Sequence, residues 1–348
     1  YKGRHEEGLS ELTESVRILE KMDSNRKMLY PLNSMGAIYY NNYNEIQKAK
    51  ECFEKCLIIS QKVSDAYYIG SSYNNLAEIY RIEDKNFEAL QFYQSSLENI
   101  TLAKDKHVEF WIYLNMTLTN IEIEDYNKAL IIQNDMEEEF MNSKYSGNLM
   151  DLFYQCRAEF YYAVGEYEKA HEYAQKSVDM CITWGITENY EAYFVKLLSE
   201  IKQSGKLDYE RDSAFLDRVF MENLYKLGRI ASVKLAEIYI SKNMQEQGIE
   251  LLNRGLNYVS KIDTDMLRLR YEYVGALAKK GAERLDSLTK LVGFIEIAEN
   301  NEIGWKIYKA IAAELVEQKN HKEALKYLIT SLSYLRKLVY NVPDEYKV

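Results

Sequence analysis

One alanine recurs along the chain at a nearly constant interval and in similar surroundings. The four copies follow one another at steps of 40, 40 and 41 residues: Ala49, Ala89, Ala129 and Ala170. A fixed interval of this size is typical of a solenoid, in which one pair of helices is copied and stacked. We therefore predict a repeat array without a single central core.

The stretch from about residue 69 to 101 displays one repeat clearly. Leu76, Ala77 and Tyr80 lie at helical spacing, and Ala89 and Tyr93 share one face of a second helix after a polar turn. The small residues at 77 and 89 would let the two helices approach closely, while the large ones fill the space around that contact. The repeat unit is thus predicted to be an antiparallel helix pair.

This pattern resembles the tetratricopeptide repeat (TPR) family, which carries leucine, a small residue and an aromatic on its first helix, then alanine, an aromatic and a small residue on its second. The residues that match are Leu76, Ala77, Tyr80, Ala89, Tyr93 and Ser96, and in the preceding unit, with one extra residue in the turn, Met35, Gly36, Tyr39, Ala49, Phe53 and Cys56. The pentapeptide Leu-Ala-Glu-Ile-Tyr at 76–80 returns unchanged at 235–239. The resemblance implies an all-α solenoid, a right-handed superhelix of antiparallel pairs, with elongated repeats like those of bacterial multi-domain signalling proteins.

The spacing predicts about eight helix pairs after an N-terminal partial repeat. Gly8, Leu12 and Ser15 fit a second helix without its first, and two degenerate units are inferred near residues 209 and 286 from spacing alone. We expect an N-terminal array over 1–204 and a more degenerate, continuous array over 205–348, with the best place for a bend at residues 202–206. Asn341 and Pro343 should end the last helix. Because the chain begins at Tyr1, we expect it to be part of a longer protein.

Charge and composition restrict the partners. A net charge of −10 argues against direct binding of nucleic acid, which needs clustered cations. No apolar run approaches the ~18 residues of a membrane span, and no signal peptide opens the chain. The cysteines Cys52, Cys56, Cys156 and Cys181 form no secreted disulfide framework in a chain this long and are interpreted as packing residues. We therefore expect a cytoplasmic protein with no membrane partner.

The sequence contains no recognisable catalytic, metal-binding or cofactor-binding pattern. Glycine-rich phosphate loops are absent, and the histidines His5, His107, His171 and His321 are scattered. We interpret His171 as a solvated helix residue, and the acidic runs 122–125 and 137–139 as solvated faces, because hard cations need converging oxygens from a tight loop. The prediction is therefore a non-enzyme without metal or cofactor.

Amide side chains recur at one position of the predicted first helices. Asn33, Asn74 and Gln155 lie three residues before the small residue, Asn75 follows directly, and Asn115 lies on a nearby helix. In peptide-binding TPRs, first helices line the concave groove and an asparagine at this position holds peptide backbone. A carboxamide donates and accepts together, as a peptide bond does. The simpler alternative is that these amides merely face water. Four further residues flank the same predicted face: Tyr30, Tyr40, Arg81 and Tyr162.

Three functional interpretations stay open. The first is a protein- or peptide-binding scaffold or sensor whose ligand is a peptide, a protein tail or a fused domain of the same polypeptide. The second is a receptor domain for a peptide pheromone of the quorum-sensing type. The third is a self-association module, in which solenoid ends or tyrosine-rich faces pair two copies as a homodimer.

Overall fold

The computed structural model describes residues 2–43, 45–140, 149–184, 188–258, 265–298 and 300–347. The chain divides into two compact units, which are described separately. Unit 1 comprises residues 1–119 and 131–149, and unit 2 comprises residues 120–130 and 150–348. The predicted division into 1–204 and 205–348 stays a prediction.

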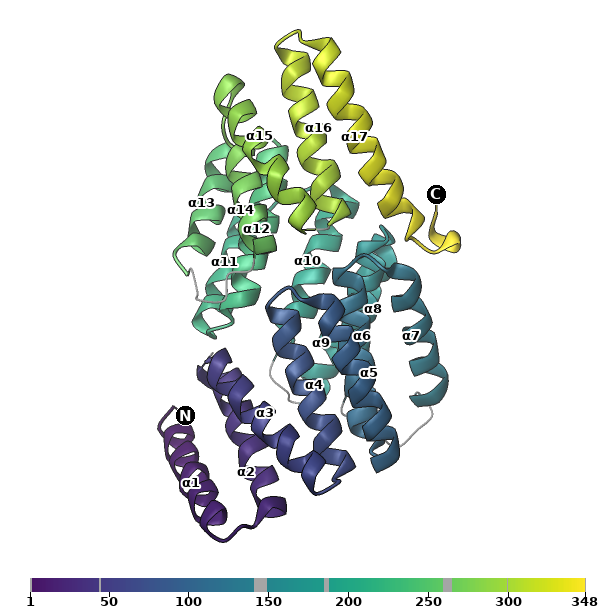
Figure 1. Cartoon of the computed structure of the whole chain (residues 1–348). Coiled ribbons are helices and arrows are strands. Elements are labelled where there is room, and N and C mark those ends of the chain that lie inside the picture. Colours follow the sequence, from purple (N-terminus) through teal and green to yellow (C-terminus); the bar gives the residue numbers. More distant parts are fainter. Residues whose placement is uncertain are drawn as a thin grey trace. The chain divides into compact units, whose positions relative to one another are not determined.

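The described residues form α-helices and short helical turns, and none of them forms a strand (Figure 1). The first helices of the repeats are α2 (Asn25–Ile38), α4 (Ala66–Ile82), α6 (Lys106–Glu122), α8 (Met150–Ala163), α10 (Tyr190–Ser204), α12 (Tyr225–Ser241), α14 (Asp265–Leu277) and α16 (Asn301–Glu317). The second helices are α3 (Ile46–Lys62), α5 (Asn86–Ala103), α7 (Tyr126–Phe140), α9 (Tyr167–Trp184), α11 (Tyr209–Met221), α13 (Gln245–Leu256), α15 (Gly281–Ala298) and α17 (His321–Tyr340). They are preceded by α1 (Lys2–Lys21), which packs against α2. This confirms the TPR-like α-solenoid of eight pairs after a partial repeat, including the two pairs inferred from spacing.

The recurring alanines occupy the positions expected for close helix contacts. Ala49, Ala89, Ala129 and Ala170 are all 0% exposed. The small residues on the first helices, Ala77, Ala158 and Ala236, are likewise fully buried. A methyl group is the largest side chain that such a close approach accepts without repacking, so the predicted register is correct.

The extra residue of the first complete repeat is accommodated in the turn between its two helices. After α2, residues Tyr39–Tyr43 form a π-helical turn, η1, before α3 begins. A π-helical turn is wider than an α-helical one and accommodates an added residue without breaking the hairpin. The helix pair therefore keeps its packing, with Phe53 against Gly36, where any Cβ would collide with the ring.

Many turns between helices contain one residue in the left-handed region, which stops the helix. Examples are Asp84 at φ 58°, Asn243 at φ 63° and Gly205 at φ 67°. Gly205 follows the end of α10, so the segment in which we expected a bend contains a helix C-terminus. Left-handed residues are the common way to end an α-helix and turn the chain back.

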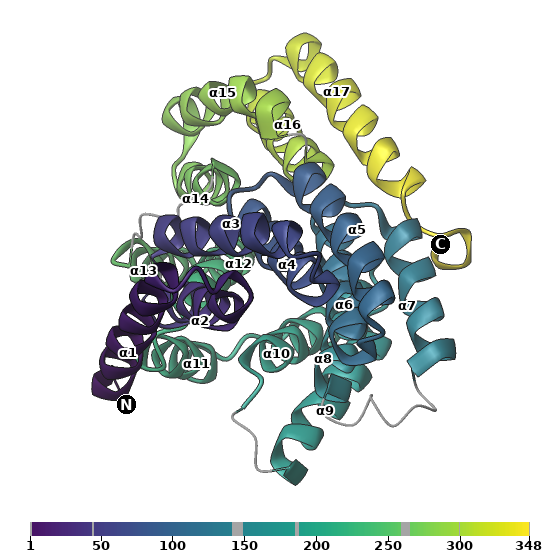
Figure 2. The ribbon, with the colours of Figure 1, turned by 60° about the horizontal axis from the view of Figure 1, so that its bottom comes forward.

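From α14 to α17, successive helices of unit 2 pack side by side in chain order (Figure 2). One large cluster of buried apolar residues runs from α10 to α17 and includes Phe215, Tyr239 and Ile307. The core is thus extended along the stack, as a solenoid requires.

The turn between α6 and α7 caps a helix far along the chain within unit 2. Glu124 is 3% exposed, and its two carboxylate oxygens accept hydrogen bonds from the backbone N–H groups of Asn301 (2.9 Å) and Glu302 (2.7 Å) at the start of α16. The prediction of a solvated acidic face over 122–125 is therefore wrong at Glu124, because a helix N-terminus needs acceptors for its free N–H groups. The run at 137–139 is exposed, as expected.

The last helix ends where the sequence predicts. Helix α17 stops at Tyr340, before Pro343 and a short 3₁₀ turn, η3 (Asp344–Tyr346). The Tyr346 ring packs edge-on against Phe160 and Tyr161. None of the described helices is long and apolar enough to cross a lipid bilayer.

Candidate functional site

The predicted first-helix amides of unit 1 bind one another in pairs. The Asn75 Nδ2 donates to Asn33 Oδ1 at 2.9 Å, and the Asn115 Nδ2 donates to Asn74 Oδ1 at 3.2 Å. Each pair joins adjacent repeats, α2 to α4 and α4 to α6. The sequence predicted the positions of these amides on their helices. It did not predict their pairing, because spacing along one helix does not specify contacts with another.

Each pair leaves part of its hydrogen-bonding capacity unused. The amino groups of Asn33 and Asn74 and the side-chain oxygens of Asn75 and Asn115 make no other hydrogen bond with the described residues. One whole amino group and one whole side-chain oxygen therefore remain per pair. A peptide group offers the complementary acceptor and donor.

Two of the flanking candidates in unit 1 meet at a carboxylate that the sequence interpretation missed. The Arg81 Nη2 binds Glu78 Oε2 at 2.8 Å, and the Tyr40 hydroxyl lies 3.5 Å from the same oxygen. The Tyr93 hydroxyl donates to the other oxygen of Glu78. The sequence feature that could have pointed to Glu78 is its place in the repeated pentapeptide at 76–80. Tyr30 is 66% exposed.

The two candidates of unit 2 differ in their surroundings. Gln155 is 8% exposed; its Nε2 donates to Glu159 at 2.8 Å, and its Oε1 accepts from Asn189 at 3.0 Å. Both ends of this amide are thus used within unit 2. The Tyr162 ring packs at a tilt against the Tyr167 ring. Burial raises the pKa of the Tyr162 hydroxyl, and the charges of nearby groups, which include Glu302 and Glu237, raise it further.

A group of charged residues on three first helices of unit 2 was not predicted. We call it the charged cluster: Lys234 and Glu237 on α12, Arg270 on α14, and Glu302 and Lys306 on α16. Lys306 binds Glu237 at 2.8 Å and Glu302 at 2.9 Å, and Glu302 also binds Arg270 at 2.8 Å. Burial works against ionisation of Glu302, but Arg270 and Lys306 outweigh it and hold the pKa well below its usual value.

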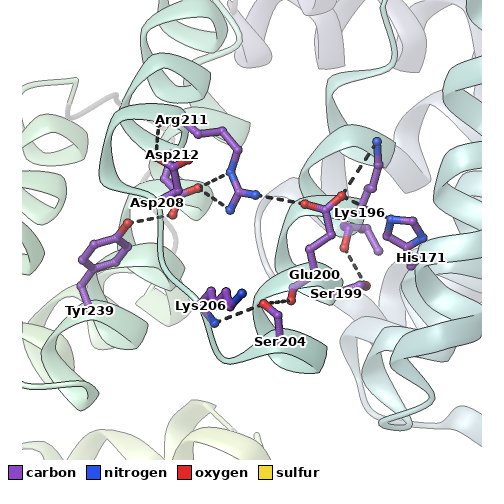
Figure 3. A network of polar contacts seen from close by, with 11 residues as sticks. His171, Lys196, Ser199, Glu200, Ser204, Lys206, Asp208, Arg211, Asp212 and Tyr239 are labelled. Carbon is purple, nitrogen blue, oxygen red and sulfur yellow. Dashed lines mark hydrogen bonds and ion pairs between the residues drawn. The ribbon is translucent and has the colours of Figure 1, made fainter.

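Another polar network lies near the connection between α10 and α11 (Figure 3). Glu200 accepts a hydrogen bond from Arg211 at 3.0 Å and lies 3.3 Å from the His171 ring nitrogen. Arg211 also contacts the fully buried Asp212, which accepts from the Tyr239 hydroxyl at 2.9 Å. His171 is therefore half-buried and paired, not a purely solvated residue, because α10 brings an acceptor beside it. Burial is the largest influence on Asp212 and raises its pKa.

This network connects four helices and its polar groups satisfy one another. A surface depression beside it is lined by Glu200, Gln203, Ser204, Lys206, Asp208 and Arg211. Among the residues that the structure describes, no group of three or more His, Cys, Asp or Glu side chains could hold a metal ion.

The fold and these first-helix faces define a class: the chain is a TPR-like helical repeat protein. No protein-family model and no curated protein matches it. It is similar in structure to a Rap protein in complex with competence and sporulation factor, with a TM-score of 0.66 and 12% identity over 97% of this chain and 99% of that one. The plasmid pLS20 Rap conjugation gene regulator, in complex with the Phr* peptide, gives a TM-score of 0.66 and 10% identity over 96% of both chains. Aspartyl phosphate phosphatase F from Bacillus subtilis gives a TM-score of 0.57 and 14% identity over 94% of this chain and 93% of that one. At these identities the likeness establishes the fold.

Proposed function

We propose that this chain is a non-catalytic peptide- or protein-binding module of a bacterial signalling or regulatory protein, which holds an extended segment along its first helices. The observation that carries the proposal is the two linked pairs of amides in unit 1, each pair with one free amino group and one free side-chain oxygen. Amides at equivalent positions of successive repeats would bind peptide backbone whatever its side chains. The segment bound is a separate peptide, a protein tail or a fused domain.

The narrower form of this proposal is a receptor for a peptide pheromone in the cytoplasm. Its support is that two structures of similar fold were solved with a bound signalling peptide: competence and sporulation factor in one, and the Phr* peptide in the other. Short free peptides would then be the natural ligands.

The test is affinity selection from a pool of random pentapeptides, followed by fluorescence anisotropy with the peptides retained. Asn74→Asp keeps the acceptor for Asn115 and removes the free donor, so we expect affinity to fall roughly tenfold without loss of the fold. Asn99→Ala is the matched control, because Asn99 lies on the second helix α5 and its side chain bonds to the Ser95 carbonyl of the same helix. Equal affinity of wild type and Asn74→Asp would refute the amide mechanism, and the absence of any retained peptide would refute peptide binding.

Self-association is a second candidate, favoured by the outer face of α17. Leu325, Leu328, Ile329 and Leu332 are between 43% and 61% exposed along this helix. Apolar side chains gathered on one exposed helix face are typical of a protein–protein contact surface. Light scattering at two protein concentrations, with Ile329→Lys as the variant, would detect a homodimer that depends on this face.

A further inference from the structure

The last repeat of unit 2 is bound by residues that lie much earlier in the chain. Besides the two bonds from Asn301 and Glu302 to the Glu124 carboxylate, Asn127 Nδ2 donates to the Asn341 carbonyl, just after α17, at 3.1 Å. All of these residues belong to unit 2, and helices α8 to α15 lie between them in the chain. In an ordinary solenoid each repeat contacts only its neighbours. These bonds therefore close unit 2 on itself.

The segment after α17 provides a second fastening. The Tyr346 ring packs edge-on against the rings of Phe160 and Tyr161, near the end of α8, with centroids 5.8 Å apart in both cases. The Lys169 ammonium of α9 lies 5.0 Å from the centre of the Tyr346 ring, and Val342 packs against the same buried cluster. We call these contacts, together with the three hydrogen bonds above, the clasp.

The clasp differs from the packing inside the stack. Buried apolar side chains hold α16 to its neighbours, among them Ile303, Ile307 and Ile311, which are at most 1% exposed. The bonds to Glu124 are polar, and withdrawing its carboxylate from water offsets part of what they contribute. Burial raises the pKa of Glu124, although the N–H groups it accepts from act in the opposite direction. Helix α16 also packs more extensively on α17 than on α15. The clasp is thus the weaker fastening, and α16 and α17 form the pair that stays together without it.

Glu302 connects the clasp to the charged cluster. Its backbone N–H binds Glu124, and its carboxylate binds Arg270 at 2.8 Å and Lys306 at 2.9 Å. Lys306 reaches from α16 to Glu237 on α12, at 2.8 Å. Ion pairs this short separate when one of the two helices moves by a few ångströms. The bonds between α16, α14 and α12 therefore require α16 to lie where the clasp holds it.

We propose that the clasp is a conformational switch for unit 2. While it is closed, α16 lies where Lys306 reaches Glu237. When it opens, α16 and α17 move together as one body, and the ion pairs that join α16 to α12 and α14 separate. A partner that binds the open arrangement more tightly shifts unit 2 toward it. This inference is independent of the proposed peptide binding.

The test is zero-length crosslinking of the full chain with a water-soluble carbodiimide, followed by mass spectrometry of the digested protein. The reagent activates a carboxylate, and a lysine amine in contact with it then forms an amide bond. Lys306 has two partners at similar distances: Glu237 on α12 at 2.8 Å and Glu302 on its own helix at 2.9 Å. The link to Glu302 needs only an intact α16 and is the internal reference. The ratio of the Glu237 link to the Glu302 link therefore reports the closed arrangement.

Wild type should form both links. We expect Glu124→Ala combined with Tyr346→Ala to lower the ratio about twofold or more, because removing contacts of the closed state shifts the population toward the open one. The control combines Asp208→Ala, which removes a local cap at the start of α11, with Tyr340→Ala, which removes a side chain that is 78% exposed. This control should keep the wild-type ratio.

An unchanged ratio in the Glu124 and Tyr346 double variant would overturn the inference, because α16 would then be held by the stack alone. An equal fall in the control pair, or a wild type that forms only the Glu302 link, would overturn it as well. Circular dichroism checks that each variant folds. Should the double variant unfold, Tyr346→Ala alone is judged by the same criterion.

Discussion

Asn115 donates a side-chain hydrogen bond at 3.2 Å to Asn74, which lies on the preceding repeat one residue before the position equivalent to Asn115. The same relation joins Asn75 to Asn33. These bonds link neighbouring repeats through polar groups, beside the apolar contacts that stack the helices. The amides thus have a structural role in addition to the binding role proposed for them.

The Asn74–Asn115 bond should appear as a coupling between the two residues. We expect Asn115→Ala to lower the free energy of unfolding by about 1 kcal/mol, because Asn74 loses its donor. A double-mutant cycle with Asn74→Ala, measured by urea unfolding, should give a coupling of roughly 0.5–1.5 kcal/mol. Strict additivity of the two single effects would show that the bond contributes nothing in solution.

The buried alanine register can be tested by overpacking. Ala89 is 0% exposed, so Ala89→Trp must displace neighbouring helices and should cost about 1–3 kcal/mol or more. Phe87→Trp is the control on the same helix, because Phe87 is 59% exposed. Thermal unfolding should show a lower Tm for the first variant only, and matching Tm values would contradict the register.

Glu124 should be a stabilising cap of α16. Glu124→Ala would leave the N–H groups of Asn301 and Glu302 without acceptors and should cost roughly 1–3 kcal/mol. Hydrogen exchange should speed up at these two amides in particular. Glu138→Ala, an exposed glutamate of α7, is the comparison, and an equal effect of both variants would argue against the cap.

The charged cluster should make stability depend on pH. The pKa of Glu302 is lower in the folded than in the unfolded state, so its ion pairs stabilise the fold above the unfolded pKa and lose this effect as pH falls through the folded value. Glu302→Gln should therefore be less stable than wild type at pH 7, by about 1 kcal/mol given its partial exposure. Urea unfolding from pH 7 down to pH 3 should show this difference shrinking. A gap that stayed constant with pH would contradict the assignment.

Lys234 should be a residue whose removal stabilises the protein. Because burial and Arg270 disfavour its charge, Lys234→Met should raise the free energy of unfolding by roughly 1 kcal/mol at pH 7. The gain should decrease as pH rises toward the ordinary lysine pKa, since the folded state releases its proton first. A lower Tm for this variant would mean that Lys234 has a stabilising partner in solution.

The sequence was most informative where one residue type must fit one place. Ala77 and Ala89 predicted the helix pair because only small side chains allow such close packing, and their spacing extended this to repeats whose signature is degenerate. It was least informative about polar partners. Glu124 looked like part of a solvated acidic run, and its role depends on Asn301 and Glu302, far along the chain.

The amino-acid sequence by itself determined the helical repeat, its length and the positions of the buried alanines, since these follow from local periodicity and side-chain size. Only the tertiary structure decided that Asn115 binds Asn74 and that Glu302 joins Arg270 to Lys306. Such contacts depend on distances of a few ångströms between different helices, and periodicity along one chain does not specify them.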